Sequence, residues 1–188
     1  MRLFTAIDLP PETRLRLERL LSALRPEALI KWSPLDNLHI TTKFIGEWPE
    51  SRLEELHSVL AGLTPREPFE ITLRELGWFP NERSPRVLSV GVDAGDSLHE
   101  LAKETEARLQ TLGIAVNEHP FSPHLTLARI MGPVPLARLR QRVTGLNSAG
   151  LGSFRVTYFS LFRSDPGSNA SIYRKLRDYR FEAALAAP

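Results

Sequence analysis

The chain has 188 residues, of which 42% are hydrophobic and 24% are charged, and its formal net charge is +2. This length and composition are typical of one folded domain, or two small lobes sharing a core, and they exclude a disordered chain. The small net charge excludes a protein that wraps long nucleic acid, although it allows a local basic pocket. The chain has no Cys, which excludes disulfides and thiolate metal sites and favours a cytoplasmic protein.

Apolar periodicity and turn residues divide the chain into short strands and helices. In chain order we expect a strand over 2–8, a helix over 10–24, strands over 29–33 and 38–46, a helix over 50–63, strands over 69–76 and 86–92, a helix over 96–112, a strand over 123–129, a helix over 136–145, and strands over 154–162 and 172–181. The third helix is expected to be capped at Asp96 or Ser97 and to end at Gly113. A charge interrupts the first apolar run, so this run predicts a strand rather than a signal peptide.

The order of these segments favours an α+β fold with antiparallel sheets. Strands and helices are interspersed without the regular strand–helix–strand repeat of parallel sheets. No apolar run reaches the length of a membrane-spanning helix. No stretch has the composition of a linker between domains. We therefore interpret residues 1–188 as a single domain.

Two of the expected strands carry the same pattern of His and Thr. The segments Leu38-His-Ile-Thr-Thr-Lys-Phe44 and Pro123-His-Leu-Thr-Leu-Ala-Arg129 each place a His two positions before a Thr. Side chains at positions i and i+2 of a strand share a face, so His39 lies beside Thr41 and His124 beside Thr126. One such pattern is usually incidental, but two among only five His predict that both faces meet around one phosphate. The two units form a weak internal repeat, which suggests two similar halves.

These four side chains have the chemistry that phosphoryl transfer requires. The imidazole pKa of about 6.5 lets His act as an acid or a base near neutral pH. Two His on opposite sides of a phosphate can divide the proton transfers, one deprotonating the attacking oxygen and the other protonating the leaving oxygen. A Thr hydroxyl beside each His can donate a hydrogen bond to a non-bridging oxygen. The residues alone do not tell which His is the acid.

Two cations close to the motifs are candidates for phosphate contacts. Strict alternation places Lys43 on the face of His39, where its ammonium would contact phosphate; a solvated surface Lys is the equal alternative. Arg129 has the wrong parity for the face of His124. It reaches the site only if the strand ends or bulges before it.

Two aromatic residues adjoin the motifs and are candidates for stacking on a nucleobase. Phe44 ends the first motif and Phe121 precedes the second. Packing in the core is the alternative for both, as for the other aromatic residues. His57 and His99 lie among charged neighbours in expected helices, and we expect both to be solvated.

A metal site is the competing chemistry for the two motif His. A zinc site usually needs a third protein ligand, and the chain has no Cys, no His-x-His and no His-Glu-x-x-His. Asp36 or Glu47 could supply a third ligand, although neither has a persuasive spacing. We therefore expect no metal and no cofactor.

The two motifs resemble the signatures of the 2H phosphoesterase superfamily, in particular its RNA 2′,3′-cyclic phosphodiesterase branch, also called 2′-5′ RNA ligase. The likeness lies in residues 32–47 and 120–129, and it extends to the opening strand and to the segment from Ser160 to Leu176. It therefore covers nearly the whole chain. Thr42 stands where the family more often has an apolar residue, at a position facing away from the cleft.

The resemblance implies a bilobal α+β fold, in which two pseudo-symmetric lobes of antiparallel sheet, backed by helices, flank a central cleft. It implies metal-independent hydrolysis of a 2′,3′-cyclic phosphate RNA end to a 2′-phosphomonoester. By motif position, His39 would protonate the departing 3′ oxygen and His124 would activate water. Thr41 and Thr126 would hold the phosphate, and Arg129 would be a further phosphate or substrate contact.

Other functions fit the same residues. An RNA-end or nucleotide-binding module would use the cleft without turnover. An enzyme of this kind could instead act on a small cyclic nucleotide or an ADP-ribose cyclic phosphate, or join 2′-5′ ends in the reverse direction. The expected partners are RNA cyclic phosphate ends, with tRNA halves as one example, and we expect a monomer that does not bind membranes. The physiological substrate, the base preference and the direction of the reaction stay open.

Overall fold

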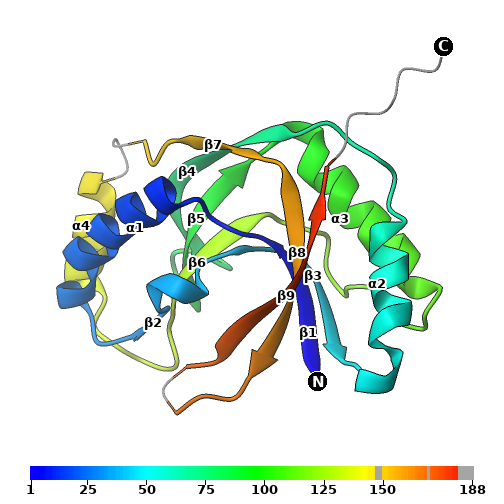
Figure 1. The fold of residues 1–188 in the computed structure, drawn as a ribbon. Coiled ribbons are helices and arrows are strands. Elements are labelled where there is room, and N and C mark those ends of the chain that lie inside the picture. The colour runs from blue at the N-terminus through cyan, green and yellow to red at the C-terminus, as the bar shows by residue number, and fades with distance from the viewer. Residues whose placement is uncertain (147–149, 169, 182–188) are drawn as a thin grey trace.

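Two antiparallel sheets form the centre of the computed structural model, which describes residues 1–146, 150–168 and 170–181 (Figure 1). The strands are β1 (Arg2–Ile7), β2 (Lys31–Trp32), β3 (Ile40–Glu47), β4 (Phe69–Phe79), β5 (Val87–Asp93), β6 (His124–Arg129), β7 (Ser153–Val156), β8 (Tyr158–Asp165) and β9 (Ile172–Arg180). The α-helices are α1 (Pro11–Leu24), α2 (Leu53–Ala61), α3 (Gly95–Gln110) and α4 (Ala137–Leu146), and the 3₁₀ turns are η1 (Arg25–Glu27), η2 (Leu35–Asn37) and η3 (Glu50–Arg52).

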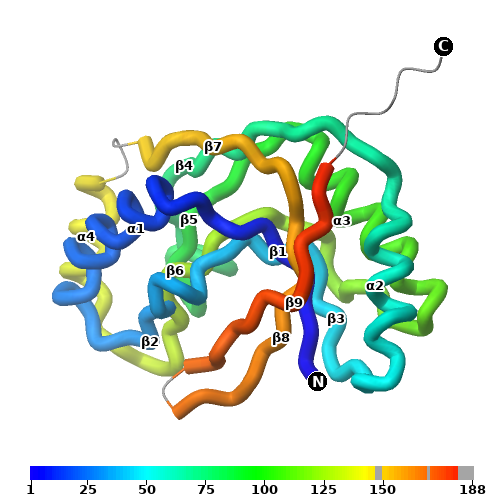
Figure 2. The backbone as a smooth tube through the Cα atoms, in the orientation of Figure 1, coloured from blue at the N-terminus to red at the C-terminus, as the bar shows by residue number. Residues whose placement is uncertain are grey.

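Each sheet belongs to one lobe. The first sheet has the strand order β3-β1-β8-β9, and the second has the order β2-β6-β5-β4-β7. Helices α2 and α3 lie together beside the first sheet, whereas α1 and α4 lie together on the other side of the molecule (Figures 1 and 2). This arrangement confirms the α+β fold with two lobes of antiparallel sheet. Among the described residues, no helix is both long and apolar enough to cross a membrane.

The single strand expected over 154–162 is wrong, because the chain changes sheets within it. Strand β7 pairs with β4 in the second sheet, while β8 pairs with β1 and β9 in the first. The change occurs at Thr157, whose carbonyl accepts a hydrogen bond from the Phe181 N–H at 2.8 Å. Both halves of the segment are equally rich in strand-forming residues, so periodicity alone gives no sign of the division.

The cap expected for helix α3 is also different. The helix begins after Ala94, and neither Asp96 nor Ser97 caps it. Instead the Asp93 carboxylate accepts a hydrogen bond from the Gly95 N–H at 3.1 Å. Asp93 therefore provides the oxygen that a residue inside the helix was expected to provide.

Both motif strands are fixed to one shared core. Ile40 and Leu125, which alternate with the polar motif residues, are completely buried, and so is Leu127. All three belong to a single apolar cluster that includes residues of both sheets. Burial of each such side chain contributes about 1.5–3 kcal/mol. A shared core therefore holds the polar faces of the two lobes in a fixed relative position.

Strand β3 contains a β-bulge directly after the motif Thr. Thr41 pairs with Ala6 and Lys43 pairs with Thr5, so Thr42 is an extra residue without a partner across the strand pair. Its hydroxyl lies 2.7 Å from the Thr5 hydroxyl inside the lobe. The extra residue interrupts the alternation of faces.

Strand β6 contains a bulge at the equivalent position. Thr126 pairs with Ser89 and Ala128 pairs with Leu88, which leaves Leu127 as the extra residue. In both strands the residue three positions after the Thr, rather than two, therefore returns to the face of the motif.

The face predicted for Lys43 is wrong because of the first bulge. Its side chain is only 1% exposed, and its Nζ lies 2.7 Å from Glu106 Oε1, 2.8 Å from the Ala115 carbonyl and 3.0 Å from Asn117 Oδ1. The hydrogen bond from Lys43 lowers the pKa of the Glu106 carboxyl. Lys43 therefore ties β3 to α3 and to the loop that follows this helix.

The solvation expected for His57 is wrong as well. This side chain on α2 is 7% exposed, and its Nδ1 lies 2.6 Å from the Tyr179 hydroxyl on β9. Burial lowers the pKa of His57 and raises that of Tyr179. The pair joins α2 to the edge strand of the first sheet. His99, in contrast, is exposed as expected.

We expect Lys43→Ala to lower the free energy of unfolding by about 3–5 kcal/mol, because it leaves Glu106 without its charged partner. Lys43→Met keeps the volume of the stem and is expected to cost less. Urea denaturation of both variants and the wild type measures the difference. A Lys43→Ala variant as stable as the wild type would contradict the buried position of the ammonium.

Candidate active site

A cleft of about 540 Å³ lies where the two lobes face each other, and both His-Thr pairs line it. The four residues are His39 and Thr41 on one side and His124 and Thr126 on the other. The cleft also has three cationic side chains, those of Arg2, Lys31 and Arg129. None of the described residues that line it is Asp or Glu. The cleft therefore suits an anionic ligand.

His39 is held by the backbone just before its strand. Its Nδ1 lies 2.7 Å from the Asn37 carbonyl, and since a carbonyl only accepts, Nδ1 carries the proton of that bond. Its Nε2 lies 3.0 Å from Thr41 Oγ1. The ring packs against Phe4 at 4.7 Å between centroids and against Tyr173 at 5.2 Å. The neutral ring therefore presents an unprotonated Nε2 beside a Thr hydroxyl.

His124 is held in the same way on the other lobe. Its Nδ1 donates to the Ser122 carbonyl at 2.8 Å. Ser122 precedes His124 by two residues, just as Asn37 precedes His39. Unlike His39, this side chain is exposed. The two lobes thus present the same ring nitrogen in the same tautomer, one imidazole being enclosed and the other open to water.

Enclosure changes the acidity of His39. Burial lowers the pKa of its imidazole to about 4, although the bond to the Asn37 carbonyl and the Asp8 carboxylate act in the opposite direction. The charges of Arg14 and His124 lower the pKa further. His39 is therefore neutral near pH 7, and a bound anion beside Nε2 is needed to favour its protonated form.

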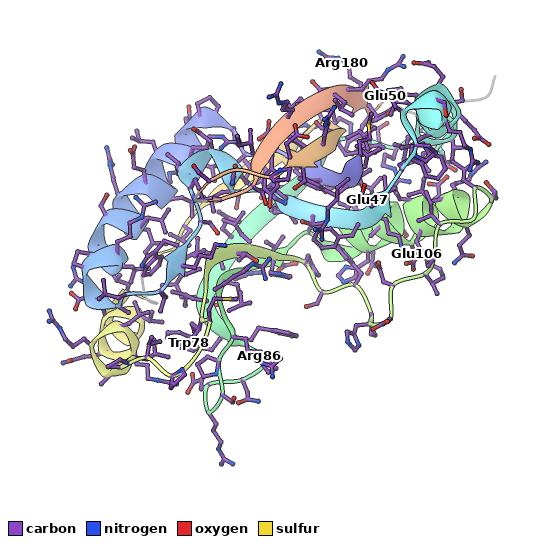
Figure 3. The ribbon with its side chains drawn as sticks, turned by 90° about the horizontal axis from the view of Figure 1, so that it is seen from below. Glu47, Glu50, Trp78, Arg86, Glu106 and Arg180 are labelled. Atoms are coloured by element: carbon purple, nitrogen blue, oxygen red, sulfur yellow. The ribbon has the colours of Figure 1, made fainter. Side chains whose placement is uncertain are left out.

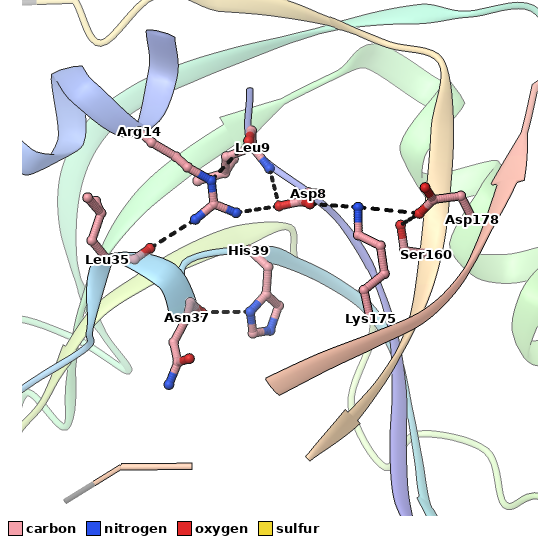
Figure 4. A network of polar contacts seen from close by, with 9 residues as sticks. All are labelled: Asp8, Leu9, Arg14, Leu35, Asn37, His39, Ser160, Lys175 and Asp178. Carbon is pink, nitrogen blue, oxygen red and sulfur yellow. Dashed lines mark hydrogen bonds and ion pairs between the residues drawn. The ribbon is translucent and has the colours of Figure 1, made fainter. Parts of the chain in front are cut away.

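Asp8, at the end of β1, lies at the centre of a network of charges behind His39 (Figure 4). It forms ion pairs with Arg14 on α1 and, at 2.9 Å, with Lys175 on β9. Arg14 also donates to the Leu35 carbonyl in η2 at 3.1 Å, the turn that contains Asn37. The network joins α1, β1, η2 and β9, and so supports the backbone that orients His39.

The bulge in β6 brings Arg129 to the cleft. Strict alternation placed it on the wrong face, and the extra residue at Leu127 restores it to the side of His124 and Thr126. Arg129 is exposed and forms no ion pair with any residue in the described ranges. Its guanidinium is thus free to meet a phosphate.

The bulge in β3 likewise turns Phe44 into the cleft, where its side chain is 60% exposed. Phe121 is placed differently: it packs edge-to-face on His99 at 5.4 Å between centroids, and it is not among the described residues that line the cleft. The stacking role considered for Phe121 therefore lacks the required position.

Sequence reasoning missed two aromatic side chains of the cleft wall. Tyr173 at the start of β9 contacts the His39 ring, and Phe79 at the end of β4 is 61% exposed in the cleft. Neither lies near a motif in the sequence, and only strand pairing brings them there. In residues 1–146, 150–168 and 170–181, no group of three or more His, Cys, Asp or Glu is arranged to hold a metal ion.

The fold and the paired motifs together define a class of protein, one with two lobes and one His-Thr pair on each lobe. The model of the LigT-like phosphoesterase family matches the chain twice, over residues 7–89 and 90–173. Each match contains one motif. The chain belongs to the LigT-like phosphoesterase family, which confirms the resemblance to 2H phosphoesterases and agrees with the internal repeat.

Curated relatives match over nearly the whole chain. The RNA 2′,3′-cyclic phosphodiesterase of Methanothermobacter thermautotrophicus is 32% identical over 182 residues, which cover 96% of this chain and 98% of the relative. The protein of the same name from Thermus thermophilus is 34% identical over 192 residues, with 95% of this chain and 89% of the relative covered.

Solved structures confirm the fold. The crystal structure of TT0787 of Thermus thermophilus superposes with a TM-score of 0.81 at 30% identity, covering 96% of this chain and 98% of that one. Escherichia coli LigT complexed with 3′-AMP superposes with a TM-score of 0.76 at 29% identity, covering 97% and 98%. The two-lobed arrangement is therefore common to these proteins.

We expect the His39 ring to stay neutral down to about pH 4 and its pKa to rise by about one unit or more when inorganic phosphate binds beside Nε2. Side-chain NMR titration of the His rings, with and without phosphate, measures both values. Exposed His99, which is not among the described residues that line the cleft, is the control that phosphate should not affect. An identical His39 pKa with and without phosphate would contradict contact between Nε2 and the anion.

Proposed function

We propose that this protein is an RNA 2′,3′-cyclic phosphodiesterase, which hydrolyses a 2′,3′-cyclic phosphate end to a 2′-phosphomonoester. The observation that carries the proposal is the convergence of two His-Thr pairs on one cleft that has cations and, among its described lining residues, no carboxylates. Relatives with this name, at 32% and 34% identity, cover nearly the whole chain and support the assignment.

In the proposed reaction, water attacks phosphorus from the side of His124, and the bond from phosphorus to the 3′ oxygen breaks on the side of His39. His124 accepts the proton of the water at Nε2, while His39 donates a proton from Nε2 to the departing 3′ oxygen. The products are a 2′-phosphomonoester and a 3′-hydroxyl. The exposed position of His124 suits contact with water, and the enclosed position of His39 suits contact with the leaving group.

Negative charge on the substrate offsets the low pKa of His39. A phosphodiester anion beside Nε2 favours the imidazolium, and the charge that develops on the 3′ oxygen favours proton transfer to it. In the proposal, Thr41 and Thr126 donate hydrogen bonds to the non-bridging oxygens and Arg129 adds a positive charge. Positioning and charge stabilisation of this kind are the main requirements of phosphoryl transfer.

The substrate in this proposal is an RNA end whose last base stacks on Phe44. Each bulged strand turns one side chain after its Thr into the cleft, Phe44 from β3 and Arg129 from β6, and Phe44 is the apolar one. The same site run in reverse would join 2′-5′ ends. tRNA halves, small cyclic nucleotides and an ADP-ribose cyclic phosphate are the substrates to compare. We take the protein to act as a monomer. We place it in the cytoplasm, because the absence of Cys fits a reducing compartment.

We expect His39→Ala and His124→Ala each to lower the rate of hydrolysis of a 2′,3′-cyclic phosphate by about 10²–10⁴-fold, because each removes one proton transfer. The assay uses a cyclic-phosphate nucleotide in excess EDTA and follows release of the 2′-phosphomonoester. His99→Ala, an exposed His on α3, is the matched control that should keep wild-type activity.

Two results would overturn the proposal. Full activity in the double His→Ala variant would show that the reaction does not need the two His. Strict dependence on a metal ion would show that the mechanism is not the metal-independent one proposed. Saturable binding with intact ligand recovered, and little change on His→Ala, would instead favour the binding module. The coupled pair should give a bell-shaped pH profile, whose two apparent pKa values belong to the pair.

A further inference from the structure

A second groove lies at the outer end of the second lobe, beyond the cleft. It is formed by the loop between β4 and β5 and by the segment that leads from β6 into α4. The basic residues that line it are Arg83, Arg86 and Arg140. Figure 3 shows Arg86 by the β4–β5 hairpin, which projects from the body of the protein, with Trp78 close by.

The groove begins where the cleft ends. Phe79, Val87 and Arg129 line the cleft, and their chain neighbours Arg86 and Ile130 line the groove. Backbone hydrogen bonds tie the two together: the Ile130 N–H donates to the Arg86 carbonyl at 2.9 Å, and the Arg86 N–H donates to the Phe79 carbonyl at 2.7 Å. The backbone that lines the groove therefore continues directly from the backbone that lines the cleft.

The charge of the groove suits a polyanion. Arg83 and Arg86 are exposed, and neither forms an ion pair with any residue of the described chain. None of the described residues that line the groove is acidic. Arg140 is held in place, because its guanidinium lies 5.2 Å from the centre of the Trp78 ring and it donates to the Glu82 carbonyl. The two unpaired Arg are thus available for phosphates.

Large apolar side chains accompany these cations. Phe79, whose carbonyl accepts the hydrogen bond from the Arg86 N–H, is 61% exposed in the cleft, and Met131 is 79% exposed in the groove. Exposed aromatic faces alternating with cations are the usual means of holding single-stranded nucleic acid, since bases stack on the rings while phosphates meet the charges. A net charge of +2 limits such a surface to a short stretch of chain.

From this continuity we propose that the groove binds the single-stranded RNA on the 5′ side of the cyclic phosphate, with Arg83 and Arg86 contacting phosphates of the nucleotides before the terminal one. The inference rests on the proposed function. A 2′,3′-cyclic phosphate occupies the 3′ end, so the strand leaves the cleft only in the 5′ direction. Arg83 and Arg86 then make the enzyme prefer an oligonucleotide end over a mononucleotide.

The test compares two substrates: a mononucleotide 2′,3′-cyclic phosphate, which reaches only the cleft, and a hexanucleotide with the same end. In the double variant Arg83→Gln/Arg86→Gln, we expect kcat/KM for the hexanucleotide to fall about three- to tenfold while that for the mononucleotide stays unchanged. The salt dependence for the hexanucleotide should become shallower by about 0.7 log units per log unit of salt for each phosphate that the variant no longer neutralises.

The matched control is Arg19→Gln/Lys103→Gln, which removes two exposed cations on α1 and α3 and should leave both substrates unaffected. Equal losses on both substrates, or no loss on the hexanucleotide, would overturn the inference. Binding of a hexanucleotide and a mononucleotide with 2′-phosphate ends, measured by competition against a fluorescent RNA, gives the same comparison without turnover. If the wild type hydrolyses neither substrate, the proposed function is contradicted, and the binding competition still tests the groove.

Discussion

The hydrogen bond from each motif His to the carbonyl two residues before it is the interaction on which the site depends. In both lobes Nδ1 donates to the backbone, at Asn37 in one and at Ser122 in the other. This bond fixes the tautomer and leaves Nε2 as the only ring nitrogen that can exchange a proton with a ligand. It also makes the orientation of the ring a property of the backbone, which is itself anchored by Ile40 and Leu125 in the shared core.

The two lobes are alike in their backbone and different in their environment. Each motif strand bulges directly after its Thr, so that one further side chain enters the cleft, Phe44 from one lobe and Arg129 from the other. An exposed aromatic ring and a positive charge thus occupy equivalent positions. The surroundings of the two imidazoles also differ. His39 is enclosed by aromatic rings and lies near the ion pairs of Asp8, whereas His124 is open to solvent. A repeated unit with unequal surroundings can assign acid and base to different lobes.

The sequence was sufficient for what depends on local periodicity and insufficient for what depends on pairing. Alternation placed His39 and Thr41 on one face, and the structure has both in the cleft. The same alternation failed at the next residues, because the bulge is defined by the partner strand and no local signal marks it; Lys43 consequently lies in the core. Tyr173 comes from a strand far along the chain, and only the order of the sheet brings it to His39. The change of sheets at Thr157 was invisible for the same reason.

A crystal structure with inorganic phosphate bound tests the central claim most directly, because the account requires both lobes to act on one phosphorus. It predicts a single phosphate in the cleft, with Nε2 of His39 and Nε2 of His124 both within about 2.7–3.2 Å of its oxygens on opposite sides. The Thr41 and Thr126 hydroxyls should contact the two remaining oxygens. A phosphate held by one lobe alone, with the other imidazole out of reach, would contradict the account.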